Sequence, residues 1–205
     1  MRNNLTVSPA AASIEFVPGN YLAPLDFDLV FGRSASVEID LGCGDGSFLT
    51  ALARQNPERN FLGIERLVGR VRSTCRKASR ENLSNLRVLR VEIAYAVRYL
   101  IPAESVAMFH LLFPDPWPKT RHHRRRIVTG EFLESIRNAL VPAGILQIAT
   151  DQADYFEQIA LLCIAIPGFA TADPALNATH PVSTFGERFR QAGAKIYLLE
   201  LRKGE

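Results

Sequence analysis

Residues that mark secreted, metal-binding or membrane proteins are scarce in this sequence of 205 residues. There are only three cysteines, Cys43, Cys75 and Cys163, and they show neither a CxxC motif nor metal-ligand spacing. We therefore expect free thiols in a reducing compartment, and neither a disulfide framework nor a metal site. The longest apolar run, residues 159–166, is much shorter than the roughly 20 residues that cross a bilayer. Because the N-terminus also shows only a weak apolar stretch, we expect a cytoplasmic protein without a membrane anchor.

The sequence also lacks repeats, linkers and a large excess of one charge. Its 24 Lys and Arg residues and 21 Asp and Glu residues give a net charge of only +3, so attraction to nucleic acid would have to come from a local patch. The hydrophobic content of 47% is ordinary for a globular core. We predict one domain over residues 1–205, in which residues 1–30, with little periodicity, form a loosely ordered lead-in.

Short apolar runs alternate with amphipathic stretches of helical length, which is typical of a doubly wound α/β fold with a parallel sheet. We predict strands at residues 36–41, 61–64, 86–91, 106–112 and 145–150. Helices are expected at residues 47–55, 131–140 and 155–166. Residues 194–203 alternate loosely and have no helix after them to carry a crossover, so we predict an antiparallel edge strand there.

The segment VEIDLGCGDGSFL, residues 37–49, predicts a strand that runs through a glycine loop into a helix. Gly42 and Gly44 permit positive φ and close approach of a ligand to the backbone. A dinucleotide-binding fingerprint needs G-x-G-x-x-G, but here the third glycine, Gly46, comes one residue early and Ser47 stands in its place. The loop therefore disfavours a nicotinamide cofactor.

Acidic residues follow or interrupt the first three predicted strands. Glu38 and Asp40 occupy alternate positions on the first strand, where they would repel a pyrophosphate and could bind an ammonium group. Glu65 follows the second strand, roughly 20 residues after the glycines, where a carboxylate can accept hydrogen bonds from both ribose hydroxyls. Glu92 follows the third strand and could contact an adenine edge. The alternative is a simple tight turn surrounded by solvated acids.

The segment LFPDPWPKTRHHRRRIV, residues 112–128, places an acid among three prolines. Prolines at positions 114, 116 and 118 restrict the residues before them, so we expect extended conformations for Phe113, Asp115 and Trp117. Asp115 would then be held just beyond the carboxyl end of the fourth predicted strand, in the crevice where open α/β sheets bind ligands. Trp117, the only tryptophan, could line that crevice or pack in the core.

A dense basic run follows directly, and it indicates phosphate binding beside the acid. The alternative is a solvated surface stretch. A second basic stretch on the helix expected after Glu65 is more typical of a solvated helix face. The adjacent histidines His122 and His123 make a poor chelating pair. The first run comprises Lys119, Arg121, Arg124, Arg125 and Arg126, and the second Arg66, Arg70, Arg72, Arg76, Lys77 and Arg80.

Four segments together resemble the bacterial tRNA (guanine-N7)-methyltransferases over roughly residues 37–201. They are EIDLGCGDGSFL, FLGIE, FPDPWPKTRHHRRRIV and ATDQADYF, in this order. The resemblance implies a mostly parallel, seven-stranded Rossmann-like methyltransferase sheet with an antiparallel C-terminal strand. It also implies S-adenosylmethionine as methyl donor and tRNA as partner, with a guanine of the variable loop as acceptor. We expect a monomer or a weak homodimer.

Residue by residue, the resemblance places Glu38, Glu65 and Asp115 on cofactor-site acids of the family. It places Lys119, Asp151, Thr184 and Glu187 on substrate-site positions, beside Arg121, Arg124 and Arg125 of the basic run. Two residues depart from the family pattern. Glu92 stands where the family usually has aspartate, and Gly186 replaces an aromatic residue within the T-x-x-E motif, which bears on the shape of the guanine pocket.

The chemistry of guanine N7 makes orientation the main task, since N7 carries a lone pair and no proton and needs no catalytic base. Asp115 is the candidate catalytic group, because a fixed carboxylate stabilises positive charge as it moves from sulfonium to purine. Asp151 or Glu187 could accept from guanine N1–H and the exocyclic amine, which adenine lacks as a donor pair. Two alternatives stay open: methylation of another RNA base, such as adenine N6, and RNA binding without catalysis.

Overall fold

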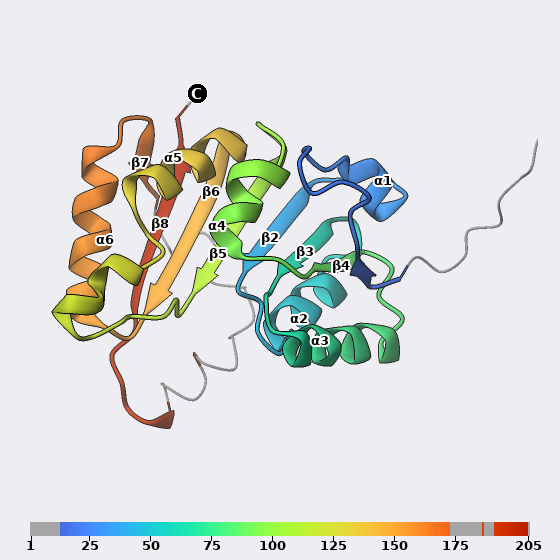
Figure 1. Ribbon diagram of the computed structural model, residues 1–205, viewed down its shortest axis with the longest axis horizontal. Helices are drawn as coiled ribbons and strands as arrows, with labels where there is room; N and C mark the ends of the chain where they lie inside the picture. Colours follow the sequence, from blue (N-terminus) through green and yellow to red (C-terminus); the bar gives the residue numbers. More distant parts are fainter. Residues whose placement is uncertain (1–12, 173–185, 187–190, 205) are drawn as a thin grey trace, which may run out of the picture.

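Eight strands of the computed structural model form one sheet within the described residues, which are 13–172, 186 and 191–204. The strand order is β1-β4-β3-β2-β5-β6-β8-β7 (Figure 1). All described neighbours pair in parallel except β8, which is antiparallel to both β6 and β7. The strands are β1 (Glu15–Phe16), β2 (Val37–Leu41), β3 (Asn60–Ile64), β4 (Leu86–Leu89), β5 (Val106–Leu112), β6 (Leu140–Thr150), β7 (Phe169–Thr171) and β8 (Tyr197–Lys203).

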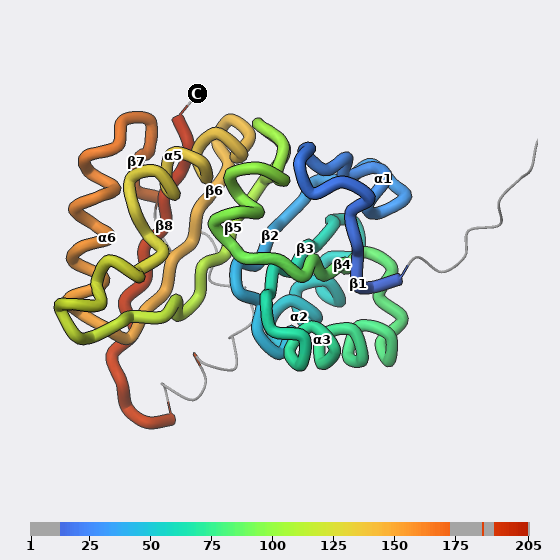
Figure 2. Tube along the Cα trace, viewed as in Figure 1, coloured from blue at the N-terminus to red at the C-terminus, as the bar shows by residue number. Residues whose placement is uncertain are grey.

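Helices cover both faces of the sheet, which confirms the doubly wound fold. Helices α2 and α3 contact each other and pack over one buried apolar cluster, while α1, α5 and α6 pack over a larger cluster on the opposite face (Figure 2). The helices are α1 (Phe27–Phe31), α2 (Ser47–Gln55), α3 (Val68–Arg80), α4 (Ile93–Tyr95), the π-helical turn η1 (Ala96–Leu100), the 3-10 helix η2 (Thr120–Arg125), α5 (Gly130–Ala139) and α6 (Ala153–Ala165). In the described part of the chain, no helix has the length and apolar character to cross a membrane.

Strand β2 shows how the two faces are made. All five residues of this strand are buried, as expected for a central parallel strand. Ile39 and its alternate neighbours join the larger apolar cluster, so Glu38 and Asp40 turn to the other face. From β2 the chain builds outward through β3 and β4, then returns to add β5 and β6 on the other side. This reversal leaves a crevice at the carboxyl ends of β2 and β5, where ligands bind in such sheets.

The predicted antiparallel strand at the C-terminus is confirmed, but its predicted place at the sheet edge is wrong. Strand β8 lies between β6 and β7, because β7 after α6 pairs with its outer side. Strand β7 has only three residues and no visible alternation in the sequence. A strand this short derives its order from pairing rather than from its own pattern.

The prediction of a loosely ordered lead-in is wrong for residues 13–30. Strand β1 pairs with β4 and adds an eighth strand to the seven expected. Helix α1 begins after Asp26, whose carboxylate accepts from the amides of Asp28 and Leu29 at 2.9 and 3.2 Å. Leu25 and Val30 are buried in the larger apolar cluster. Tertiary packing therefore orders a segment that has little local periodicity.

Candidate active site

A cleft of about 590 Å³ opens at the carboxyl ends of the central strands, in the size range of small-molecule sites. Its walls come from the ends of β2 and β3, the start of α4 and the loop after β5. Sequence-predicted residues that line it are Gly42, Glu65, Glu92, Asp115 and Arg125. The fold thus brings together side chains spread over more than 80 positions of the sequence.

The glycine loop adopts the predicted positive-φ conformation, with φ of 82° at Gly42 and 57° at Gly44. Gly42 donates to the carbonyl of Ile64 at 2.8 Å and lines the cleft. Gly46 has another purpose, since it caps α2 and a Cβ there would collide with Thr74 of α3. The first glycine therefore shapes the cleft, and the third permits α2 and α3 to pack closely.

Two carboxylates at the cleft are held by backbone amides. Glu65 is 5% exposed; its Oε1 accepts from the amide of Leu67 at 2.9 Å, and Oε2 lies 3.6 Å from Arg70 Nη1. Glu92 is exposed and caps α4 by accepting from the amide of Tyr95 at 2.8 Å. Glu65 is therefore a fixed acceptor suited to ribose hydroxyls, and Glu92 is a second acceptor in the lining of the cleft.

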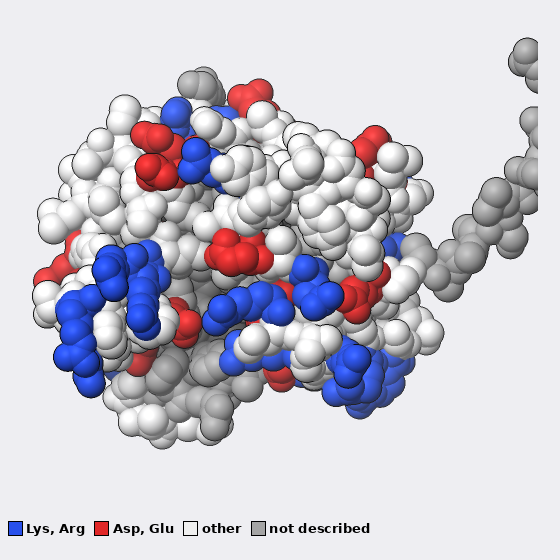
Figure 3. Space-filling view, viewed as in Figure 1, with Lys and Arg blue, Asp and Glu red and all other residues white. Residues whose placement is uncertain are grey.

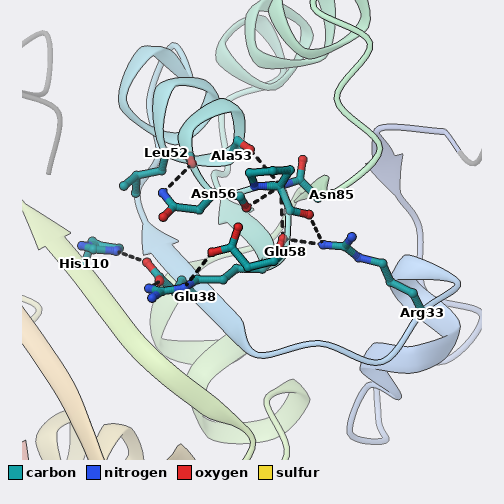
Figure 4. A network of polar contacts seen from close by, with 10 residues as sticks. Arg33, Glu38, Leu52, Ala53, Asn56, Glu58, Asn85 and His110 are labelled. Carbon is teal, nitrogen blue, oxygen red and sulfur yellow. Dashed lines mark hydrogen bonds and ion pairs between the residues drawn. The ribbon is translucent and has the colours of Figure 1, made fainter.

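The structure does not bring Glu38 to the cleft. Its buried carboxylate faces Arg59 Nη1 at 2.6 Å and His110 Nε2 at 3.1 Å (Figure 4 shows the His110 pair). Burial opposes ionisation, but the hydrogen bond and charge of His110, and then those of Arg59, outweigh it and lower the pKa of Glu38. Glu38 is absent from the described residues that line the cleft, so its placement does not support the predicted cofactor contact.

Asp40 is also buried behind the cleft lining, two residues before Gly42. It pairs in register with His110 of the neighbouring strand β5. Burial raises the pKa of Asp40 to about 7; the charge of His110 opposes this rise and that of Glu65 adds to it. With this pKa, Asp40 changes charge near neutral pH.

A buried hydrogen-bonded chain of polar side chains crosses four strands beside these acids, and it was not predicted from the sequence. His110 Nδ1 lies 3.2 Å from Gln147 Oε1, and Gln147 Nε2 donates to Glu200 Oε1 at 2.8 Å. Together with Glu38, these residues link β2, β5, β6 and β8 on one face of the sheet. The signal was a polar residue with an apolar neighbour on each side, namely His110 in VAMFHLL, Gln147 in ILQIAT and Glu200 in YLLELRK.

The loop after β5 places Asp115 in the cleft, exposed to solvent. Its neighbours are not extended as predicted, because φ is 54° at Phe113 and 43° at Trp117. A following proline disfavours the right-handed helical region but leaves positive φ open. The amide of Phe113 donates to Ala149 on β6 at 2.7 Å, so the hydrogen bonding to β6 continues up to the residue with positive φ.

Arg126 has a structural role, and its guanidinium is not available to bind RNA. The prediction that the whole basic run binds phosphate is therefore wrong for this residue. Its side chain is 2% exposed and donates to the carbonyl of Pro116 at 2.8 Å and to Gln158 Oε1 at 2.6 Å. It also forms an ion pair with Asp154, and its hydrogen bond is the main cause that lowers the pKa of Asp154. Arg126 therefore fastens the acid-bearing loop to α6.

The rest of the first basic run is exposed along η2 and its N-cap, as Lys119, Arg121, Arg124 and Arg125. Figure 3 shows basic side chains on both sides of an acidic group on this face, over the loop that carries η2 and over α3. From the second basic stretch, Arg66 and Arg70 line the cleft, whereas Lys77 binds Asp45 at 2.6 Å. The start of α3 thus joins the site, which the sequence alone did not indicate.

The remaining predicted substrate residues are not joined to the cleft by the described structure. Asp151 follows β6 and accepts from Gln152 Nε2 at 2.9 Å, and it is absent from the described lining of the cleft. Thr184 and Glu187 lie outside the described residues. Their roles stay predictions.

Comparison with known proteins relates the chain to methyltransferases. A family model described as "Putative methyltransferase" matches residues 34–199. A tRNA (guanine-N(7)-)-methyltransferase of Syntrophotalea carbinolica is 36% identical over 185 residues, which cover 88% of this chain and 80% of that protein. One of Leifsonia xyli is 39% identical over 189 residues, covering 87% and 81%. The solved structure of the 16S rRNA methyltransferase KamB superposes with a TM-score of 0.63 at 20% identity, over 87% of this chain and 93% of that one, and shows the shared fold.

Proposed function

Because this chain belongs to the tRNA (guanine-N(7)-)-methyltransferase family, we propose that it methylates N7 of a guanine in the tRNA variable loop, with S-adenosylmethionine as methyl donor. One observation carries the proposal: an exposed acid, Asp115, shares a cleft with the ribose-type acceptor Glu65 and with Arg125 of the basic run. The proposed reaction needs an acid that binds the cofactor, an acid beside the reacting base and a cation that binds RNA phosphate, and Glu65, Asp115 and Arg125 would supply these three groups in one cleft.

The residues of the cleft fit the cofactor. Its volume of about 590 Å³ accepts a nucleoside with an amino-acid tail, and Gly42 lets such a ligand approach the backbone. Glu65, whose Oε1 accepts from Leu67, would receive the ribose hydroxyls, and Glu92, which also lines the cleft, would contact an adenine edge. When bound, S-adenosylmethionine supplies an electrophilic methyl group: the N7–C bond forms as the S–C bond breaks, and positive charge passes to the purine.

The protein's contribution is placement and electrostatics. N7 needs no base, so the chain must hold the purine in line, an effect worth on the order of 7 to 11 kcal/mol in ideal cases. Asp115, in the loop after β5, offers a carboxylate that would stabilise the positive charge as it moves. Lys119, Arg121 and Arg124 are exposed beside the cleft and would bind the phosphates of the RNA.

We further infer a cytoplasmic enzyme that acts as one domain and as a monomer or weak homodimer, without a metal. The three cysteines are free, which suits a reducing compartment. A tRNA substrate also supports the proposed cytoplasmic location.

The decisive experiment incubates unmodified tRNA with isotopically labelled S-adenosylmethionine and identifies the labelled nucleoside by mass spectrometry. We expect N7-methylguanosine. Asp115→Ala should lower turnover by about 100-fold or more, because it removes a charge that acts on the reacting base. Its tRNA affinity should stay within about twofold, and Glu157→Gln, which changes an exposed acid away from the cleft, should behave as the parent.

Two outcomes would replace the proposal. Labelled N6-methyladenosine would assign the site to adenine. Binding of tRNA without any labelled nucleoside would make the chain an RNA-binding protein with a methyltransferase fold. A circular dichroism spectrum of Asp115→Ala that matches the parent ensures that lost turnover reports chemistry.

A further inference from the structure

Trp117 lies in the wall of the cleft, two residues after Asp115, and is the only tryptophan of the chain. Its side chain is partly exposed. Among the residues that the structure describes, neither buried apolar cluster includes it. A large indole that is kept out of the core and turned into a ligand cleft is available to bind a ligand.

The backbone holds this indole in an uncommon conformation. Trp117 has φ of 43°, which is unfavourable for a bulky residue, and it stands between Pro116 and Pro118. Arg126 donates to the carbonyl of Pro116 at 2.8 Å and so fixes the turn from one side. Positive φ at such residues persists where the surroundings enforce it, and these positions cluster at ligand sites. The indole is therefore pre-positioned.

The face of the indole already attracts a cation. The guanidinium carbon of Arg125 lies 4.9 Å from the ring centroid, and the ring of His122 lies 5.9 Å away with an interplanar angle of 87°. Arg125 is exposed and belongs to the basic residues expected to bind phosphate. The geometry shows that this ring face accepts a positive charge, which the π electrons stabilise.

We propose that Trp117 stacks on the reacting purine and binds its cationic, N7-methylated form more tightly than the neutral form, after Arg125 has moved to a phosphate. The inference rests on the proposed function and adds a purine-binding residue to it. Guanine is neutral before transfer and cationic after it, so an indole face favours the charge that develops. An interaction that strengthens along the reaction raises kcat rather than ground-state affinity alone.

Fluorescence tests this directly, because the single indole makes the signal unambiguous. The full chain is titrated with guanosine 5′-monophosphate and with N7-methylguanosine 5′-monophosphate, near pH 6, where the methylated base stays cationic. We expect both to quench Trp117, with the methylated nucleotide bound at least about fivefold more tightly. Equal affinities for the two nucleotides would overturn the proposal. So would an unchanged Trp117 emission at nucleotide concentrations that calorimetry shows to be saturating.

Kinetics separate stacking from scaffolding. Trp117→Leu should lower kcat on tRNA by about tenfold or more, whereas Trp117→Phe, which keeps an aromatic face, should retain most of it. Affinity for S-adenosylmethionine by calorimetry should stay within about twofold in both variants. Tyr99→Leu removes an aromatic ring that is 48% exposed on η1 and should behave as the parent.

Other results would point elsewhere. Equal losses in the Leu and Phe variants together with lost cofactor affinity would make Trp117 a structural part of the loop, and normal kcat in the Leu variant would exclude stacking. If the parent forms no N7-methylguanosine, the proposed function fails by itself, and the nucleotide titration still decides whether Trp117 prefers a cationic purine.

Discussion

Glu38 and Asp40 lie two residues apart on β2 and are almost equally buried, at 2% and 3% exposure, yet their pKa values move in opposite directions. The difference lies in their partners. Glu38 contacts Arg59 and His110, and both contacts favour its charged form. Asp40 has burial as its main influence and the negative Glu65 as a neighbour. Position in the sequence alone therefore does not predict the charge of an acid on a strand.

The raised pKa of Asp40 predicts that stability falls with pH in a defined window. Between its ordinary value of 3.8 and about 7, the folded protein keeps a proton that the unfolded chain releases. The contribution of Asp40 to the free energy of unfolding is therefore lost as pH rises through that interval, and above the interval it no longer changes with pH. The side chain of Asp40→Asn cannot ionise, so the variant does not lose this contribution. The free energy of unfolding of the variant minus that of the parent should therefore be larger at pH 7 than at pH 4, by on the order of 3 kcal/mol.

Urea unfolding across this range measures the gain, and only the change with pH counts, since the amide alters other contacts equally at every pH. Glu157→Gln, at an exposed acid, should show a constant difference from the parent. A constant difference for Asp40→Asn as well would show that Asp40 ionises normally in the folded protein.

At the scale of elements, the loop after β5 and η2 depends on α6 through Arg126. Arg126→Met keeps much of the side-chain volume but removes the donors to Pro116, Gln158 and Asp154. We expect the free energy of unfolding to fall by about 2 to 4 kcal/mol, less than for a fully buried pair because Asp154 is 55% exposed. Hydrogen exchange of the amides in residues 113–125 should quicken about tenfold, as measured by mass spectrometry of peptides.

Arg124→Met is the matched control, two residues earlier and exposed. It should leave stability within about 0.5 kcal/mol and the exchange of the loop unchanged. If the two variants exchange alike, Arg126 does not hold the loop.

The same elements show what sequence reasoning can reach. Asp115 was placed correctly, because a buried parallel strand must deliver the residues after its carboxyl end to one edge of the sheet. The different role of Arg126 could not be predicted. The run RHHRRR offers similar cations, and the partners that set Arg126 apart, Asp154 and Gln158, come 28 and 32 residues later. Strand β1 was missed for the same reason, since two residues carry no periodicity and gain order only from β4.

For the whole molecule, the distribution of charge matters more than its total. A net charge of +3 gives little general attraction to RNA, yet basic side chains flank the cleft on this face (Figure 3). Arg121 and Arg124 are exposed on η2, whose last residue Arg125 lines the cleft, while Arg66 and Arg70 line it at the start of α3. We therefore expect the binding of tRNA to depend on a few local phosphate contacts.

Charge reversal tests this with the salt dependence of binding as the readout. Each lost phosphate contact lowers the slope of log K against log salt concentration by about 0.7 to 0.9, since fewer counterions are released. Arg121→Glu with Arg124→Glu should therefore weaken tRNA binding at low salt and flatten the slope by about 1.5. Arg76→Glu places the same new charge on the exposed face of α3, beyond the turn that reaches the cleft, and should leave the slope unchanged. Equal flattening in both proteins would mean that tRNA responds to the overall field, and the basic run on η2 would lose its special role.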